Sequence, residues 1–172
     1  LTMRLFSEEK RMHTFELLMT SPVTSLQIVL GKYFATVFAV FGLVLLTFIY
    51  PLSTITLTKF AFAPLLISLL GFFIMGAIYA AMGLFASALT ETGWIALASA
   101  VLLNLALWFS NIAATTADSE LSRKILQHIS VSAHLSSLAD GTIRTNGLIF
   151  FASIIVLFCF LTERVVESTR WR

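Results

Sequence analysis

Long runs without a charged residue constrain this sequence more than any other feature. A helix needs about 20 largely apolar residues to cross the hydrocarbon core of a membrane. Three of the charge-free runs exceed that length, and the fourth can be extended by flanking residues whose polar ends reach the interface. The sequence therefore predicts an all-α, polytopic helical membrane protein with about four transmembrane helices. The four runs are Tyr33–Thr58, Phe60–Thr90, Thr92–Ala117 and Thr145–Thr162.

Composition excludes several other classes of protein. Hydrophobic residues make up 58% and charged residues 12%, whereas a soluble domain has about 45–50% and about 25%. The net charge of +2 is small and the basic residues lie at the ends of the apolar runs, so no nucleic-acid partner is expected. Cys159 is the only cysteine, which excludes a disulfide within the chain and a thiolate metal cluster.

The chain divides into a charged segment, 1–32, which leads into the membrane, and a transmembrane domain, 33–172. Within the domain we expect an external loop-helix region at 117–146 and a cytoplasmic tail at 163–172. Pro51 should end the first span, because proline lacks the amide donor that a helix interior needs. The expected spans are Tyr33 to about Tyr50, Phe62 to Leu89, Trp94 to about Ala114, and Gly147 to about Glu163.

The first segment is the only long amphipathic stretch. Its apolar residues recur at helical spacing, with acids and bases on the remaining faces. Ser7 can cap the start of this helix, Pro22 ends it, and Thr24 and Ser25 can cap the helix that follows. The apolar positions are Leu5, Met12, Phe15, Leu18 and Met19.

The basic residues are distributed unequally between the two sides of a four-span topology. Seven of the eleven lie on the side that holds both ends, and four lie on the other side. The positive-inside rule therefore predicts that both ends face the cytoplasm. The seven are Arg4, Lys10, Arg11, Lys32, Arg164, Arg170 and Arg172; the four are Lys59, Arg123, Lys124 and Arg144.

No catalytic or metal-binding pattern is present in the sequence. The three histidines have no partner at metal-ligand spacing. Gly31-Lys32 does not complete a phosphate-binding loop, since Leu26 stands where that motif has its first glycine. The apolar runs contain no acid or base for proton coupling. We therefore expect no catalytic residue, no metal and no enzymatic activity on this chain.

Small residues form one stripe in the second span. Gly76, Ala80, Gly83 and Ser87 fall at offsets of 0, 4, 7 and 11, which places them on one helix face that a second helix can approach closely. Packing between neighbouring spans is the favoured interpretation, and a moving or dimeric interface is the alternative. Asn104, inside the third span, is expected to make a hydrogen bond to another helix.

The segment from Phe6 to Val23 resembles the cytoplasmic coupling helix of type-2 ABC transporter permeases, most closely the gliding-motility and nitrous-oxide-cluster branch. That family reads Glu-Glu-(Lys/Arg)-Arg-x-Gly-Thr-x-Glu-Leu-Leu, then Thr-x-Pro-Val and, at the next span, Gly-Lys. His13 replaces the family's glycine. The matching residues are Glu8, Glu9, Lys10, Arg11, Thr14, Glu16, Leu17, Leu18, Thr20, Pro22, Val23, Gly31 and Lys32.

This resemblance implies spans three to six of a six-span permease, in a chain truncated at its N-terminus. It implies a bacterial inner-membrane exporter subunit that pairs with a separate ABC ATPase subunit and with a second copy or a related permease. ATP and Mg would bind to the partner, with no cofactor on this chain. The alternative is a membrane scaffold or assembly factor that transports nothing. The expected partner-binding residues are Glu8, Glu9, Arg11, Thr14, Phe15, Glu16 and Leu18.

Overall fold

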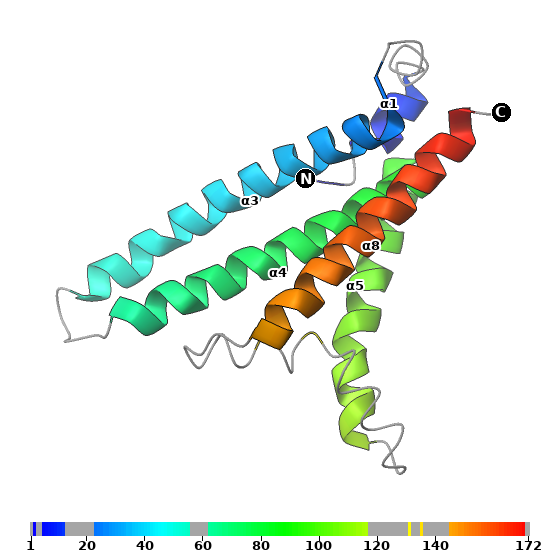
Figure 1. The fold of residues 1–172 in the computed structure, drawn as a ribbon. Helices are drawn as coiled ribbons and strands as arrows, with labels where there is room; N and C mark the ends of the chain where they lie inside the picture. The colour runs from blue at the N-terminus through cyan, green and yellow to red at the C-terminus, as the bar shows by residue number, and fades with distance from the viewer. Residues whose placement is uncertain are drawn as a thin grey trace.

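A computed structural model of the chain describes residues 2, 5–12, 23–55, 62–116, 131, 135 and 145–170. Every element in these ranges is a helix, and none of these residues lies in a strand. The predicted all-α fold is therefore confirmed. The helices, labelled in Figure 1, are α1 (Ser7–Arg11), α3 (Ser25–Ile55), α4 (Phe62–Leu89), α5 (Gly93–Thr116) and α8 (Thr145–Arg170).

Helix α4 is the centre of the bundle. It packs against α3, α5 and α8, and α3 also packs against α8. Figure 1 shows α3, α4 and α8 running alongside one another, while α5 leaves the bundle at an angle. The short helix α1 and the C-terminal end of α8 lie at the same end of the bundle, where α1 contacts α4 and α5.

Among the described residues, three helices are long and apolar enough to cross a membrane, against about four spans expected from the sequence. They are Ser25–Pro51, Ala63–Leu89 and Thr145–Thr169. The described apolar part of α5, Gly93–Phe109, is shorter than a full span. Many large apolar side chains point outward, as Phe38 (77% exposed) and Trp94 (81% exposed) do. Such outward apolar surface is suited to a hydrocarbon environment and costly in water.

Two of the predicted helix starts are correct. Helix α4 begins at Phe62 and ends at Leu89, as expected. At the start of α3, the Gln27 amide donates to Thr24 Oγ1 (3.3 Å) and the Thr24 amide donates to Gln27 Oε1 (3.1 Å). This reciprocal pair is a capping box, which satisfies amide donors that the first turn of a helix leaves free.

Two helices extend beyond the predicted ends of their spans. Helix α3 continues through Pro51 to Ile55, although the candidate membrane span within it ends at Pro51, as expected. A proline removes a single amide donor, and a long apolar helix in a membrane tolerates that loss. Helix α8 does not end near Glu163 either, since it extends to Arg170 and includes most of the expected tail.

The core has two parts, stacked along α4. One part lies at the α1 end and contains Phe6, Val29, Leu84 and Val166. The other contains Ile78, Met82, Val131 and Phe151. Phe6, from the N-terminal segment, is fully buried among residues of α3, α4 and α8, so this segment is part of the packed bundle.

Candidate functional site

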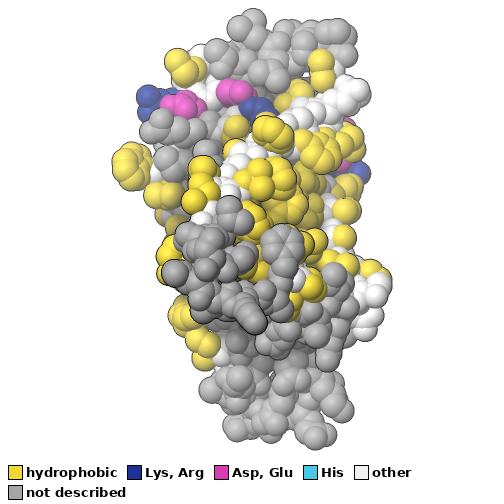
Figure 2. Space-filling view, turned by 90° about the vertical axis from the view of Figure 1, so that its left-hand side faces the viewer, with side chains coloured by type: hydrophobic (Ala, Val, Ile, Leu, Met, Phe, Trp, Pro, Cys, Tyr) yellow, Lys and Arg dark blue, Asp and Glu magenta, His cyan; other side chains and the backbone are white. Residues whose placement is uncertain are grey.

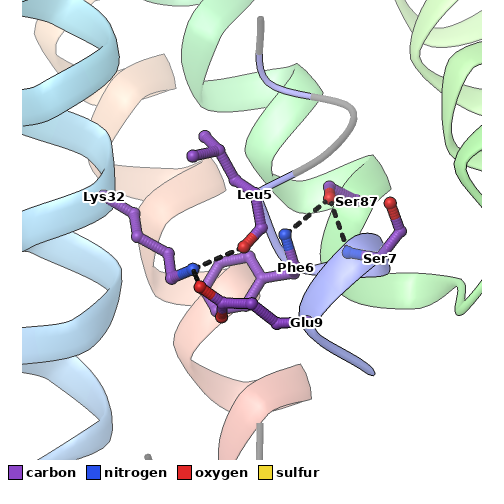
Figure 3. Close-up of polar contacts among 6 residues, drawn as sticks. All are labelled: Leu5, Phe6, Ser7, Glu9, Lys32 and Ser87. Atoms are coloured by element: carbon purple, nitrogen blue, oxygen red, sulfur yellow. Dashed lines mark hydrogen bonds and ion pairs between the residues drawn. The ribbon is translucent and has the colours of Figure 1, made fainter. Parts of the chain in front are cut away.

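The candidate site is the N-terminal segment, residues 5–12, where it docks on the bundle. Its first anchor is Ser87 on α4, whose hydroxyl oxygen accepts the amide of Phe6 (3.1 Å) and that of Ser7 (3.2 Å) (Figure 3). All three residues are fully buried. The expected cap by Ser7 is wrong: Phe6 is the N-cap residue, and its own side chain makes no capping hydrogen bond. Ser87 instead satisfies donors that a helix start leaves free.

The second anchor is Lys32 on α3. Its ammonium forms an ion pair with Glu9 Oε1 (2.6 Å), donates to the carbonyl of Leu5, and lies 4.6 Å from the centroid of the Phe6 ring (Figure 3). The Lys32 side chain is 14% exposed and that of Glu9 is 31% exposed. An ammonium group that is so little exposed to water is stabilised by the carboxylate, the carbonyl and the aromatic ring around it. Lys32 therefore joins α3 to the N-terminal segment.

The third anchor is Lys10, whose ammonium donates to the carbonyl of Ala88 (2.6 Å) in the last turn of α4. The final carbonyls of a helix lack partners within it and carry partial negative charge, so a cation stabilises them. Burial lowers the pKa of Lys10, and the nearby Glu91 carboxylate opposes that shift by a smaller amount.

The stripe of small residues on α4 receives neighbours from this same chain. A Cβ at Gly76 would lie 2.5 Å from Val40 Cγ1 of α3, and one at Gly83 would collide with the side chain of Thr2. Ala80 is buried in the core at the α1 end. With Ser87 bound to Phe6 and Ser7, the stripe accommodates α3 along one part and the N-terminal segment along another.

The outward side of the docked segment carries charge. Glu8 and Arg11 are exposed, and so is Met12, which the sequence placed on the apolar face. Glu9 differs from the expectation, since its carboxylate faces Lys32 and the bundle. The remaining expected partner-binding residues, Thr14, Phe15, Glu16 and Leu18, lie outside the described residues.

The roles of Lys32 and Lys10 as anchors were missed by reasoning from the sequence. The available signal was that Lys32 lies within the apolar start of a span, where an ammonium needs a carboxylate. The sequence offered Glu8, Glu9 and Glu16 as candidates, and only the folded chain selects Glu9. No comparable signal pointed to Lys10, because its acceptor is a backbone carbonyl.

Within the described part of the chain, Asn104 makes no hydrogen bond to another helix. Its amide nitrogen donates to the carbonyl of Ala100 (2.7 Å), one turn earlier on α5. Helix α5 diverges from α8 and α3 (Figure 1). The Asn104 amide therefore uses an acceptor within its own helix. This contact stabilises α5 locally and does not join it to the bundle.

The contacts of the site are polar and ionic. Among the described residues, no group of three or more His, Cys, Asp or Glu side chains could hold a metal ion. The site consists of ammonium–carboxylate and amide–hydroxyl contacts on its inner side and of exposed charges on its outer side. No protein family, no curated protein and no solved structure matches this chain.

Proposed function

We propose that this chain is the membrane permease subunit of an ATP-driven ABC exporter and that residues 5–12 belong to its coupling helix. One observation carries the proposal. The N-terminal segment is bonded to α3 and α4 through Lys32, Ser87 and Ala88, yet it exposes Glu8 and Arg11. A passive interfacial helix would instead place its apolar face in lipid and be rich in basic residues. The likeness to the coupling helix of type-2 permeases supports the same function.

The anchors explain how force on the segment would reach the spans. A separate ATPase subunit, which binds ATP and Mg, would contact the outward charges as it closes and opens. Displacement of α1 would act on α3 through Lys32 and on α4 through Ser87 and Lys10, so both helices would move with it. A second copy or a related permease would complete the pathway for a substrate that the sequence does not identify.

The expected location is the bacterial inner membrane, with both ends in the cytoplasm. Charged side chains gather near the α1 end of the face in Figure 2, and apolar side chains cover its middle. This end carries Lys10, Arg11, Lys32 and Arg164, whereas the four basic residues that the sequence assigns to the other side lie outside the described residues. The orientation is therefore proposed on the seven-to-four count in the sequence alone.

Reversal of outward charges tests the coupling function. In membranes reconstituted with this protein and its co-expressed ATPase subunit, Arg11→Glu and Glu8→Lys should each reduce the stimulation of ATP hydrolysis about tenfold or more, because mispaired charges at a docked interface cost several kcal/mol. Arg123→Glu, which the basic-residue count assigns to the other side, is the matched control and should have little effect. Membrane insertion should be unchanged in all three variants.

Two outcomes would decide against the proposal. Normal stimulation of ATP hydrolysis in both Arg11→Glu and Glu8→Lys would show that residues 5–12 are not part of a coupling helix. A stable complex with a cytoplasmic partner, without any effect of the chain on ATP hydrolysis, would establish the alternative of a scaffold or assembly factor.

A further inference from the structure

A second feature of the bundle is an apolar groove between α3 and α8. Its volume is about 360 Å³, which is at the small end of ligand-binding pockets. The lining includes Leu26, Leu30 and Phe34 of α3 and Val156, Phe160 and Glu163 of α8. Of the described lining residues, Glu163 is the only charged one. The groove lies toward the same end of the bundle as α1.

The depth of the groove relative to the span follows from the order of residues on α8. The apolar run ends at Thr162 and charge begins at Glu163, so Glu163 lies where the helix leaves hydrocarbon. The other residues of α8 in the groove, from Ile155 to Phe160, lie within the apolar run. Water gains little in a groove without polar partners, whereas a hydrocarbon chain fits its apolar walls.

Charged side chains of both signs lie near the boundary end of the groove, where Glu163 lines it and Arg164 lies beside it. The Arg164 guanidinium lies 4.9 Å from the centroid of Phe160, a lining residue, and pairs with Glu167 at 3.3 Å. That pair is exposed, with 63% of the Arg164 side chain accessible, so it contributes less than about 1 kcal/mol and can be exchanged. A guanidinium binds phosphate well, and a carboxylate binds an ammonium group.

We propose that the groove binds one acyl chain of a phospholipid with an amine headgroup, with its phosphate at Arg164 and its ammonium at Glu163. Charge complementarity selects this occupant, because an apolar groove that ends in a carboxylate and a guanidinium matches a zwitterionic amphiphile. The inference depends on the membrane location in the proposed function and does not depend on an ATPase partner.

Native mass spectrometry of the purified full chain, titrated with phosphatidylethanolamine or phosphatidylglycerol, tests the proposal. The wild type should bind one phosphatidylethanolamine about tenfold more tightly than phosphatidylglycerol. Val156→Trp fills the groove and should weaken phosphatidylethanolamine binding about tenfold or more. Leu157→Trp is the matched control: Leu157 is similarly exposed on α8 but does not line the groove, so binding should be unchanged. Glu163→Gln should abolish the preference for the amine headgroup.

Three results would overturn the proposal. Unchanged binding in Val156→Trp would place the lipid elsewhere. If the wild type bound the two phospholipids equally, or bound a free fatty acid as tightly, the headgroup would make no specific contact with Arg164 or Glu163. A change of oligomeric mass in Val156→Trp without loss of lipid would show that a second copy covers the groove. Detergent extraction of the wild type from membranes, measured first, tests the membrane location separately.

Discussion

Single polar residues decide how the N-terminal segment is held. Ser87 is buried on a helix of mostly apolar residues, and its partners lie 80 and 81 residues away in the sequence. Lys32 likewise reaches Glu9 and Leu5 from the start of α3. Buried polar groups are stable only when they are paired. The docking of α1 should therefore depend strongly on these few side chains.

Replacement of Ser87 by alanine tests this dependence at one residue. Ser87→Ala removes the hydroxyl oxygen that accepts the amides of Phe6 and Ser7, and we expect this to cost about 1–3 kcal/mol. We expect hydrogen exchange of these two amides to accelerate by about tenfold to a hundredfold. Ser153→Ala is the control, because the Ser153 hydroxyl is exposed and donates only within α8, to Phe150. Unchanged exchange at Phe6 and Ser7 in Ser87→Ala would contradict the docking of α1 through Ser87.

Some helix ends are set by residues close in sequence, and others are not. The capping box at Thr24 and Gln27 was visible in the sequence, because both partners lie within one turn. Pro51 was expected to stop the first span, yet helix α3 continues to Ile55, since a proline removes only one backbone donor from a helix. Local signals thus predicted the start of α3 and both ends of α4, but they missed the start of α1 and the end of α3.

The distance between α3 and α4 should depend on Gly76. In Gly76→Ala the new methyl group would overlap Val40 Cγ1 at 2.5 Å, and the β-branched valine has little rotamer freedom within a helix. We expect a loss of about 1–3 kcal/mol in unfolding free energy, as for other overpacked cores. The measurement is reversible unfolding in mixed detergent micelles.

Two further variants make this test specific. Gly42, on the same pair of helices, has no neighbouring atom within 4 Å of the place that a Cβ would occupy, so Gly42→Ala should be neutral or stabilise by up to about 1 kcal/mol. Val40→Ala combined with Gly76→Ala should recover part of the loss. Equal effects of Gly42→Ala and Gly76→Ala would show that the close approach at Gly76 has no energetic role.

At the scale of the whole molecule, the alternating helices bring α1 and the end of α8 to one end of the bundle (Figure 1). If that end faces the cytoplasm, a single cysteine at Ser168 should resist an impermeant reagent applied to sealed cells. A cysteine at Ser122 or Ser137 should react, in a Cys159→Ala background that removes the native thiol. Labelling at Ser168 in sealed cells would reverse the predicted topology.

The sequence by itself determined the helical class and most of the apolar helices. Charge-free runs and the 3.6-residue period are local properties, and the apolar content of 58% exceeds that of an ordinary soluble domain. It also identified the segment at Glu8 to Arg11 as a candidate docking surface and the stripe from Gly76 to Ser87 as a packing face.

Only the tertiary structure decided which residues distant in sequence contact one another. It turned Glu9 inward to Lys32, placed Thr2 over Gly83, and gave Ser87 two backbone amides as partners. It also opened α5 away from the bundle and left a groove between α3 and α8. These outcomes depend on how helices distant in sequence pack together, and local periodicity specifies the face of a helix without specifying its neighbour.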